Sequence, residues 1–328
     1  MNTAREELYQ RIPLEVPFSI HVFPSYYCNF RCNYCLHSLS ETILQKKGFR
    51  RQFMDFLTFE KTVDDAKTFG SPIKALIFAG HGEPLLHKNI AEMVAYAKKS
   101  GCFERVEIVT NGFLLTKELS DRLIEAGLDR LRVSLQGLTA QSYRDVSGVD
   151  IDFEQFRENL AYFYRNKVAT EVYIKIIDIA LKCPEEKNLF YEQFSPIADI
   201  AAIEYAIPFV NEIDYSSLGE LSKKNKQGHI GRSNVCSMPF YMLVVAPNGD
   251  VLPCCATDVP LVFGNVKESG LKEIWNSNIR RGFLCEQLRG VKGISVCDMC
   301  SVPSFGLQEG DYLDGHEDEL MERIVNQA

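Results

Sequence analysis

The sequence lacks an excess of basic residues and lacks long apolar runs. Its 328 residues include 36 Lys and Arg against 44 Asp and Glu, a formal net charge of −8. Binding to a phosphate backbone needs clustered cations, so this charge argues against a nucleic-acid partner. No window of 18 uncharged apolar residues occurs, and the N-terminus MNTAREELYQRIPLE has no apolar stretch of the kind found in signal peptides. We therefore expect a cytoplasmic protein with no membrane partner.

Cysteine, in contrast, is plentiful, with 11 residues. In a reducing compartment, cysteines more often serve metal binding or catalysis than disulfides. Most of them fall into two groups, at 28–35 and at 236–300. Two groups predict two metal sites.

The first group is Cys28, Cys32 and Cys35, with the spacing C-x3-C-x2-C. A structural zinc site needs four ligands, and no fourth cysteine lies nearby. A 4Fe-4S cluster held by three thiolates keeps one iron open to another molecule. A surface zinc knuckle or a chance cluster is the alternative interpretation.

This spacing resembles the motif of the radical S-adenosylmethionine (radical SAM) enzymes, and Tyr34 before the third cysteine also fits that family. The resemblance implies a 4Fe-4S cluster whose open iron binds the amino and carboxylate groups of SAM. It also implies a reductase of the flavodoxin or ferredoxin type as electron donor.

Apolar strands alternate with helices over the first 210 residues. This alternation predicts an α/β fold with a parallel sheet and right-handed crossovers. If such a sheet curves, it forms a partial (β/α)6 TIM-like barrel, which is the core fold of the family that the sequence resembles. The expected strands are 17–24, 75–80, 105–112, 131–137, 171–180 and 200–210, and the expected helices are 58–69 (capped by Thr58), 88–100, 116–126, 140–146, 153–166 and 185–194.

Chemistry in a parallel barrel is expected at the carboxyl ends of the strands. After the second strand, Gly80–Pro84 is similar to the family's glycine-glutamate motif, which receives the SAM amino group, with His81 at a position that is often glycine. Each of these signals alone is equally typical of a turn or of a polar side chain bonded to the backbone. Together, the resemblance and the strand positions predict these SAM-binding residues: Tyr34, Gly82, Glu83, Asn111, Ser134, Gln136 and Lys175.

The polar segment 211–233 is expected to be a linker, with Lys223, Lys224 and Lys226 on a solvated face. It divides the chain into a barrel at 1–210 and a C-terminal domain at 234–328. That domain starts with a β-hairpin, in which strands 241–246 and 251–253 flank Asn248-Gly249, a strong type I′ turn signal. The hairpin leads into Cys254 and Cys255.

The second cysteine group provides four thiolates, from Cys236, Cys254, Cys297 and Cys300. Four thiolates suit a second cubane cluster, and they also suit zinc. The spacing G-x4-C ending at Cys254, the phrases GNV and LKEIWNS, and the closing C-x2-C are similar to the SPASM/Twitch extensions of radical SAM enzymes. The resemblance implies one auxiliary 4Fe-4S cluster in a small β-hairpin and helix domain, with Cys102, Cys183 and Cys285 as bystanders.

The resemblance also implies an activity. Reductive cleavage of SAM gives a 5′-deoxyadenosyl radical, which abstracts a hydrogen atom from the substrate. An auxiliary cluster that accepts the remaining electron makes the reaction an oxidation, so dehydrogenation is the leading hypothesis. If Cys255 instead returns a hydrogen atom, the enzyme is a redox-neutral epimerase. Cys255 could also be a buried side chain or an alternative cluster ligand.

The substrate is the least determined part of the interpretation. About 16 residues precede the first strand, which leaves no room for a leader-peptide-binding domain and favours a small molecule. A similar cysteine arrangement occurs in an aminocyclitol dehydrogenase, so a polyol, sugar or aminocyclitol is expected. Peptide modification is the second hypothesis, and an iron-sulfur electron-transfer protein or a zinc scaffold is the non-enzymatic one.

Overall fold

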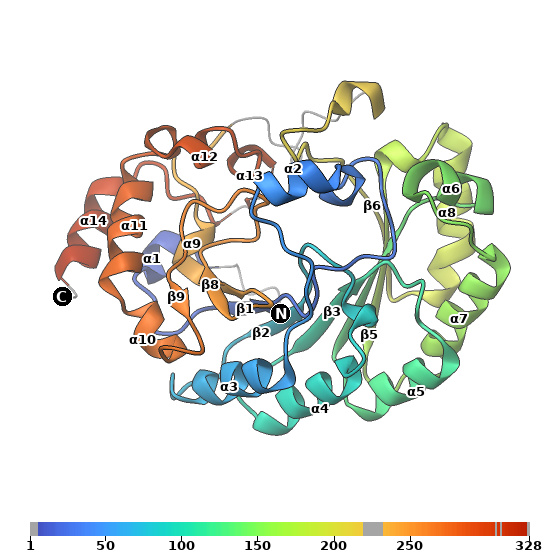
Figure 1. The fold of residues 1–328 in the computed structure, drawn as a ribbon, viewed down its shortest axis with the longest axis horizontal. Coiled ribbons are helices and arrows are strands. Elements are labelled where there is room, and N and C mark those ends of the chain that lie inside the picture. The colour runs from blue at the N-terminus through green and yellow to red at the C-terminus, as the bar shows by residue number, and fades with distance from the viewer. Residues whose placement is uncertain (1–5, 219–231, 306, 309, 327–328) are drawn as a thin grey trace.

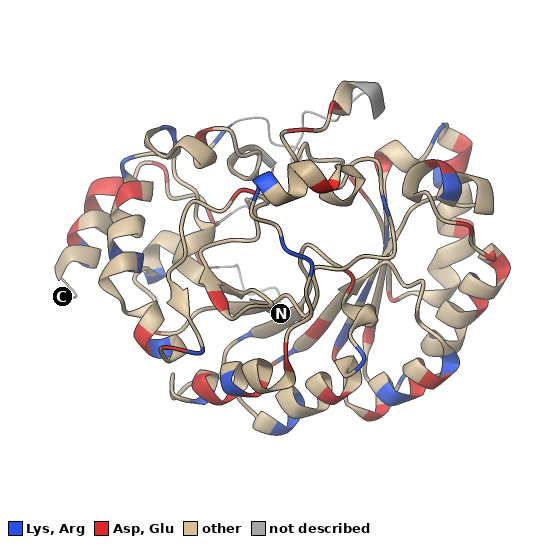
Figure 2. Ribbon diagram, viewed as in Figure 1, with Lys and Arg blue, Asp and Glu red and all other residues tan. Residues whose placement is uncertain are grey.

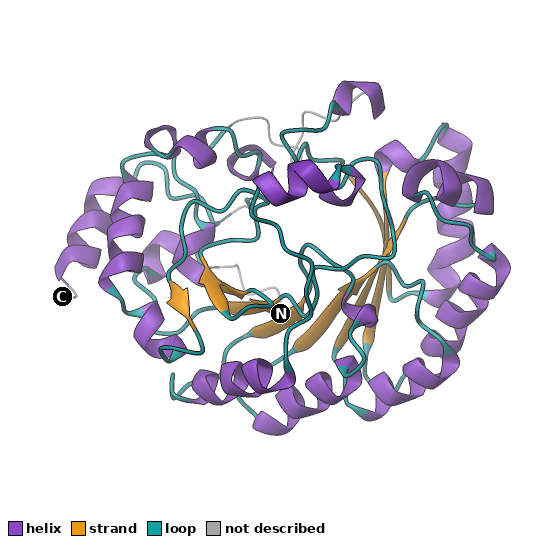
Figure 3. Cartoon of the chain, in the orientation of Figure 1, coloured by secondary structure: helices purple, strands orange, loops and turns teal. Residues whose placement is uncertain are grey.

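One curved sheet of nine strands forms the centre of the molecule, in the order β6-β5-β4-β3-β2-β1-β7-β8-β9. The computed structural model describes residues 6–218, 232–305, 307–308 and 310–326. Figures 1 and 3 show the sheet inside an outer layer of helices. The strands are β1 (Ser19–Val22), β2 (Ala75–Phe78), β3 (Val106–Thr110), β4 (Arg130–Leu135), β5 (Glu171–Ile177), β6 (Ile200–Glu204), β7 (Met242–Val245), β8 (Asp250–Leu252) and β9 (Gly264–Asn265).

Helices connect the strands and cover the outer face of the sheet (Figure 3). The α-helices are α1 (Leu8–Arg11), α2 (Glu41–Lys46), α3 (Phe56–Lys67), α4 (Ile90–Ser100), α5 (Lys117–Glu125), α6 (Ala140–Ser147), α7 (Phe153–Asn166), α8 (Pro184–Phe194), α9 (Met238–Tyr241), α10 (Leu271–Trp275), α11 (Asn278–Leu288), α12 (Ser295–Asp298), α13 (Val302–Phe305) and α14 (Glu317–Asn326). Short 3-10 helices are η1 (Leu36–Ser38), η2 (Pro84–Leu86), η3 (Asp178–Ala180), η4 (Ser195–Ile197), η5 (Tyr215–Leu218) and η6 (Val291–Gly293). No helix among the described residues is long and apolar enough to cross a membrane.

The first six strands run parallel and pair in sequence order from β1 to β6. The sheet curves but its two outer strands, β6 and β9, do not pair with each other. This is the α/β partial barrel that the alternating pattern predicts. Each of the six expected strand ranges contains or overlaps one of the strands β1 to β6. Parallel pairing brings the carboxyl ends of all six strands to one edge of the barrel.

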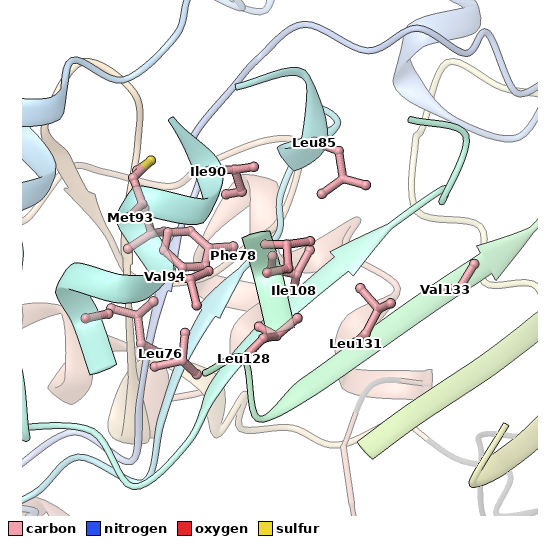
Figure 4. Close-up of a cluster of buried hydrophobic side chains, with 14 of the residues drawn as sticks. Leu76, Phe78, Leu85, Ile90, Met93, Val94, Ile108, Leu128, Leu131 and Val133 are labelled. Carbon is pink, nitrogen blue, oxygen red and sulfur yellow. The ribbon is translucent and has the colours of Figure 1, made fainter. Parts of the chain in front are cut away.

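Because successive side chains of a strand point to opposite faces, the sheet has an apolar outer face and a more polar inner face. On β4, Leu131 and Val133 are buried, whereas Arg130, Arg132 and Ser134 alternate with them and are partly exposed. Figure 4 shows the outer side, where side chains of α4 pack on those of β2, β3 and β4. The labelled residues are Leu76, Phe78, Leu85, Ile90, Met93, Val94, Ile108, Leu128, Leu131 and Val133. Figure 2 shows charged residues on the strands inside the curve as well as on the outer helices.

The C-terminal hairpin is not a separate sheet but extends the sheet of the barrel. Strand β7 pairs parallel with β1, in the register Ser19 to Met242, and β8 then pairs antiparallel with β7. The apolar core is also continuous, because Trp275 and Phe283 belong to the same buried cluster as Ile20. A six-stranded open sheet would leave one edge of β1 unpaired, and β7 fills that edge.

Two local predictions were wrong in detail. The cap of α3 is Asp55 rather than Thr58, since the Asp55 carboxylate accepts a hydrogen bond from the Thr58 amide at 2.8 Å. In the hairpin turn, Gly249 has φ +94°, but none of the described non-glycine residues has a positive φ. A type I′ turn would need a positive φ at Asn248 as well, so the loop is instead a turn in which Gly249 alone takes the left-handed conformation.

Part of the expected linker is folded against the barrel. Residues 219–231, which include the three lysines, lie outside the described part of the chain. Before them, Tyr215 is buried in η5, and its hydroxyl donates to the Tyr34 carbonyl at 2.9 Å. The same hydroxyl accepts hydrogen bonds from the Phe209 and Val210 amides. Residues 211–218 therefore help to hold the segment that carries the first three cysteines.

Candidate functional site

The first three cysteines lie in the loop after β1, here called the cysteine loop (residues 25–35). Its backbone is fixed to the end of α6, because Arg31 donates to the Ser147 carbonyl and Asn33 to the Val146 carbonyl, both at 2.9 Å. Cys32 is buried, and Cys28 and Cys35 are half-buried. The strand end thus holds three thiols in a shielded loop at the carboxyl edge of the barrel.

The three thiols lie close enough to affect one another. Burial, together with the nearby Glu83 and Cys35, raises the pKa of Cys28 to about 12. Burial, Cys35 and Cys28 likewise raise the pKa of Cys32 well above its ordinary value. Three crowded thiolates are stable only beside positive charge, which the irons of a cluster would supply. The donor set therefore fits a three-cysteine 4Fe-4S site.

The glycines after β2 allow that loop to pack directly on the cysteine loop. A Cβ atom on Gly82 would lie 2.1 Å from the Ser25 carbonyl oxygen and 2.7 Å from that of Tyr27. The neighbouring Glu83 amide donates to the Tyr27 carbonyl at 2.8 Å. A Cβ on Gly80 would likewise fall 2.3 Å from the Phe23 ring. Glycine is therefore required at Gly82 for the two loops to meet, and at Gly80 because no side chain fits beside the Phe23 ring.

The side chain of Glu83 is 2% exposed and joins two of these loops. One carboxylate oxygen accepts from the Leu85 amide at 2.9 Å and the Thr110 hydroxyl at 2.5 Å, and the other accepts from the Asn111 amide at 2.8 Å. Burial raises the pKa of Glu83 to about 7, although these donors act in the opposite direction. A carboxylate has about four acceptor positions, so little capacity remains for another donor. A contact with the SAM ammonium stays a prediction.

Three other predicted SAM-binding residues are linked to the cysteine loop by hydrogen bonds. Asn111 donates to Asn29 at 2.9 Å. The Tyr34 hydroxyl donates to the Gln136 side chain. Gln136 in turn donates to the carbonyl of Ser134 at 3.1 Å. The ends of β3 and β4 therefore converge on the cysteines, as the strand order requires.

Lys175, in contrast, is bound elsewhere. It donates to Glu204 on β6 at 2.7 Å, and the Tyr173 hydroxyl donates to the same carboxylate at 3.0 Å. The sequence did not predict this partner, because it depends on the register between β5 and β6. A contact between Lys175 and the SAM carboxylate stays a prediction.

The four predicted cysteine ligands of the C-terminal region, Cys236, Cys254, Cys297 and Cys300, line one small, mostly apolar cavity. Burial, together with the neighbouring cysteines, raises the pKa of Cys236 to about 12. No three His, Cys, Asp or Glu side chains of the described residues form a site for a single metal ion. Four soft sulfur donors around one cavity nevertheless fit a thiolate-bound cluster.

Two side chains that the sequence did not identify form hydrogen bonds with the second set of cysteines. Arg232 donates to the carbonyls of Cys297 at 2.8 Å, Asp298 at 2.6 Å and Cys300 at 3.1 Å. The buried Gln287 donates to the Cys297 sulfur at 3.4 Å. Neither residue lies in a recognisable motif, so only the fold reveals them. Cys285 is not part of the set, since it packs in a separate apolar cluster with α1 and α14.

A cavity of about 430 Å³ lies between the two cysteine sets. Tyr34 and Cys35 line it from the cysteine loop, and Cys255 and Thr257 line it from the C-terminal region. Cys254, beside Cys255 in the chain, faces the other cavity with the second set. A molecule in the central cavity therefore lies between the two expected cluster positions.

His81 forms part of the wall of this cavity and of a neighbouring one of about 320 Å³. Its Nε2 donates to the Ala256 carbonyl at 3.2 Å, which ties the loop after β2 to the C-terminal region. Burial lowers the pKa of His81 to about 4, so its imidazole is neutral near pH 7. A third hollow, of about 930 Å³, is lined by the amino ends of β1, β2 and β4, on the other side of the barrel.

Comparison with known proteins agrees with both halves of this arrangement. Residues 22–179 match the profile of the Radical SAM superfamily, and residues 236–301 match that of the SPASM iron-sulfur cluster-binding domain. The AdoMet-dependent heme synthase of Methanosarcina barkeri is 23% identical, over 88% of this chain and 91% of that protein. The GTP 3′,8-cyclase of Chlorobaculum tepidum is 37% identical, but the match spans only 40% of this chain and 37% of the cyclase.

Solved structures share the fold at lower identity. BtrN in complex with AdoMet and 2-DOIA superposes with a TM-score of 0.57 at 20% identity, covering 90% of this chain and 98% of BtrN. Streptococcus suis SuiB bound to precursor peptide SuiA gives 0.56 at 19% identity, over 91% of this chain and 76% of SuiB. The chain therefore belongs to the radical SAM superfamily, uses a 4Fe-4S cluster and S-adenosylmethionine, and carries an iron-sulfur SPASM domain toward its C-terminus.

Proposed function

We propose that this enzyme dehydrogenates a small polyol, sugar or aminocyclitol substrate. The observation that carries the proposal is the position of the central cavity, with Cys35 on one wall and Cys255, next to the second cysteine set, on another. The two-cluster arrangement suits an oxidation, because a second cluster near the substrate offers an electron acceptor that a redox-neutral reaction does not need. That BtrN, with AdoMet and 2-DOIA bound, has the same fold is consistent with a small ligand in this place.

The residues of the chain would hold and shield the reacting groups. Cys28, Cys32 and Cys35 would bind the first cluster, and Cys236, Cys254, Cys297 and Cys300 the second. Tyr34, Gly82, Glu83, Asn111, Ser134 and Gln136 would surround SAM, with Lys175 as a more distant candidate. The bound cofactors supply the radical chemistry, which is cleavage of SAM, hydrogen abstraction from the substrate and acceptance of the remaining electron.

The cavity wall contributes protection and a proton acceptor. Most of its lining is apolar, including Phe23, Ile77, Val109 and Phe209, and such a lining excludes water from reactive species. Oxidation of an alcohol also releases a hydroxyl proton. His81 is neutral near pH 7, and since Nε2 donates to the backbone, Nδ1 is its acceptor atom. Because burial lowers the pKa of this imidazole to about 4, Nδ1 would pass the proton on rather than hold it.

Epimerisation is the second candidate function, because Cys255 lines the central cavity rather than the cavity of the second cysteine set. If the substrate occupies this cavity, the Cys255 thiol would lie beside it. A thiol there could return a hydrogen atom to the substrate carbon, with no net oxidation.

One experiment decides between the two reactions. Anaerobically reconstituted enzyme is incubated with SAM, a reductant and candidate polyols and sugars in deuterated water, and the product is analysed by mass spectrometry. We expect a product lighter by two hydrogen atoms, without deuterium, from both the wild type and Cys255→Ser. Deuterium at the reacting carbon without mass loss, abolished in Cys255→Ser but retained in the control Cys285→Ser, would contradict dehydrogenation in favour of epimerisation.

A further inference from the structure

The central cavity contains one unusual group, the guanidinium of Arg132. Most residues that line this cavity are apolar or uncharged. Of its described lining, Arg132 alone carries a permanent charge at neutral pH, because His21 and His81 are both held neutral. A single cation inside a mainly apolar cavity needs an explanation.

Arg132 reaches the cavity because it lies on the inner face of β4. Alternation along the strand places Arg130, Arg132 and Ser134 on this face, with Leu131 and Val133 outside. In the register of the sheet, Arg132 lies beside Val109 of β3 and Tyr173 of β5. Its guanidinium lies 5.5 Å from the centre of the Tyr173 ring. The Tyr173 ring is thus within the range of a cation–π contact with Arg132.

The charged neighbours of Arg132 on the inner face are paired with one another. Arg130 pairs with Glu171, and Lys175 pairs with Glu204. Among the described residues, no hydrogen bond or ion pair involves Arg132. The Glu171 carboxylate is therefore engaged one level below Arg132, and the Glu204 carboxylate is engaged by Lys175, which lies one level above Arg132. The Arg132 donors are left available to the cavity.

Physical chemistry favours an anion at this position. A guanidinium stays charged at any physiological pH, and its planar fork of N–H donors matches the two oxygens of a carboxylate or phosphate. Arg132 is only partly exposed and the cavity around it is lined mainly by apolar side chains, so its charge is less well hydrated than that of a surface arginine and gains more from an oxyanion partner. The Arg132 charge extends across the cavity, since it adds to burial in lowering the pKa of His21.

The SAM carboxylate is the obvious competitor for this cation. The residues expected to contact SAM on β4, Ser134 and Gln136, lie beyond Arg132 at the carboxyl end of the strand. Arg132 lies one inward-facing position deeper in the barrel than Ser134. An anion on Arg132 would therefore lie below the predicted SAM contacts, on the substrate side of the cavity.

We propose that Arg132 binds an oxyanion group, a carboxylate or a phosphate, of the substrate. This inference rests on the proposed function and narrows it. Among the candidate substrates, an acidic or phosphorylated sugar or polyol fits the cavity, whereas a cationic aminocyclitol would be repelled by Arg132. The enzyme would thus select its substrate by charge as well as by shape.

The test measures binding of inorganic phosphate and of acetate to the anaerobically reconstituted, SAM-loaded enzyme by calorimetry. Loading with SAM occupies the site of the SAM carboxylate. We expect the wild type to bind at least one of the two anions, and Arg132→Gln to bind it at least about tenfold more weakly, since charge-assisted contacts are lost. Arg132→Lys, which keeps the charge but not the fork, should be intermediate. A preference for phosphate or for acetate identifies the kind of oxyanion.

Controls separate the anion site from folding and from SAM binding. Arg165→Gln, an exposed arginine on α7, should bind anions like the wild type. Iron content and SAM affinity should be unchanged in Arg132→Gln. Three outcomes would overturn the proposal: no anion binding by the wild type, equal binding by Arg132→Gln, or an equal loss of SAM affinity in that variant. Because these measurements need no turnover, they stand apart from the dehydrogenation test, and an epimerised product would leave the anion site intact.

Discussion

The carboxylate of Glu83 combines an observed structural role with a predicted role in binding SAM. It is expected to receive the ammonium of SAM, and it already accepts hydrogen bonds from Leu85, Thr110 and Asn111. Removing the whole side chain would leave these buried donors without an acceptor, at about 1–3 kcal/mol for each unsatisfied group. A fall in SAM affinity in a Glu83→Ala variant could therefore come either from the lost contact with SAM or from disordered loops.

Glu83→Gln separates these tasks better, because it keeps the shape and one acceptor oxygen while removing the charge. We expect SAM affinity to fall about tenfold to a hundredfold, the value of a charge-assisted contact of about 1.5–3 kcal/mol, with iron content retained. The matched control is Thr110→Val, which removes one hydrogen bond to Glu83 and leaves its charge. SAM affinity is measured by equilibrium binding. If Glu83→Gln and Thr110→Val bind SAM equally well, Glu83 does not contact SAM through its charge.

The sequence reveals residues that carry chemistry better than it reveals their partners. Cysteine spacing and the Gly80–Pro84 motif are local patterns, and the fold brings them together as expected. The pairing of Lys175 with Glu204 and the position of Arg132 in the cavity depend on strand register, which is set by long-range packing. Tyr215 and Arg232 were also missed, because their partners are backbone carbonyls far away in the sequence.

At the scale of elements, Lys47, which lines the neighbouring 320 Å³ cavity, connects three segments of the chain. It follows α2, and its side chain is 11% exposed. The ammonium lies 2.7 Å from Glu212, after β6, and 2.6 Å from Asp258, after β8. One cation thereby links the helix after the cysteine loop to both segments that border the central cavity.

Lys47→Met should loosen this connection, because the aliphatic stem is kept while two carboxylates lose their shared cation. We expect the free energy of unfolding to fall by about 1–3 kcal/mol, as for a charge-assisted hydrogen-bonded group. Amide exchange should become faster near Glu212 and Asp258. The matched control is Lys46→Met, an exposed residue one position earlier. Equal exchange rates at both segments in the two variants would show that Lys47 does not hold them.

Strands and helices were largely predictable, and their connections were less so. Apolar runs such as ALIF on β2 and the alternating LRVSL on β4 mark strands because each must bury one face. The cap of α3 shows the limit of such patterns, since Asp55 and Thr58 both fit a helix start and only the backbone geometry selects Asp55. The pairing of β7 with β1 joins residues more than 200 positions apart, and no local pattern encodes it.

At the scale of the whole molecule, the barrel and the C-terminal region share one sheet and one core. Val251, Phe263 and Trp275 belong to the same buried cluster as residues of β1. We infer that the two regions unfold together, even though their sequence profiles are separate. The two cysteine sets, in contrast, lie in different places, one in the cysteine loop and one around its own cavity.

This separation predicts that each cluster can be removed alone. Anaerobically reconstituted wild type should hold about eight irons, and Cys28/Cys32/Cys35→Ala about four, because each cubane contains four. Replacing Cys236, Cys254, Cys297 and Cys300 by Ala should also leave about four, together with SAM binding at the first cluster. The control Cys255→Ala should keep all eight, since Cys255 faces the central cavity rather than the second cysteine set.

Iron and zinc analysis with electron paramagnetic resonance provides the measurement. Zinc in place of the second four irons would refute the auxiliary cluster, and loss of about four irons in Cys255→Ala would make that cysteine a ligand and exclude it as a hydrogen donor.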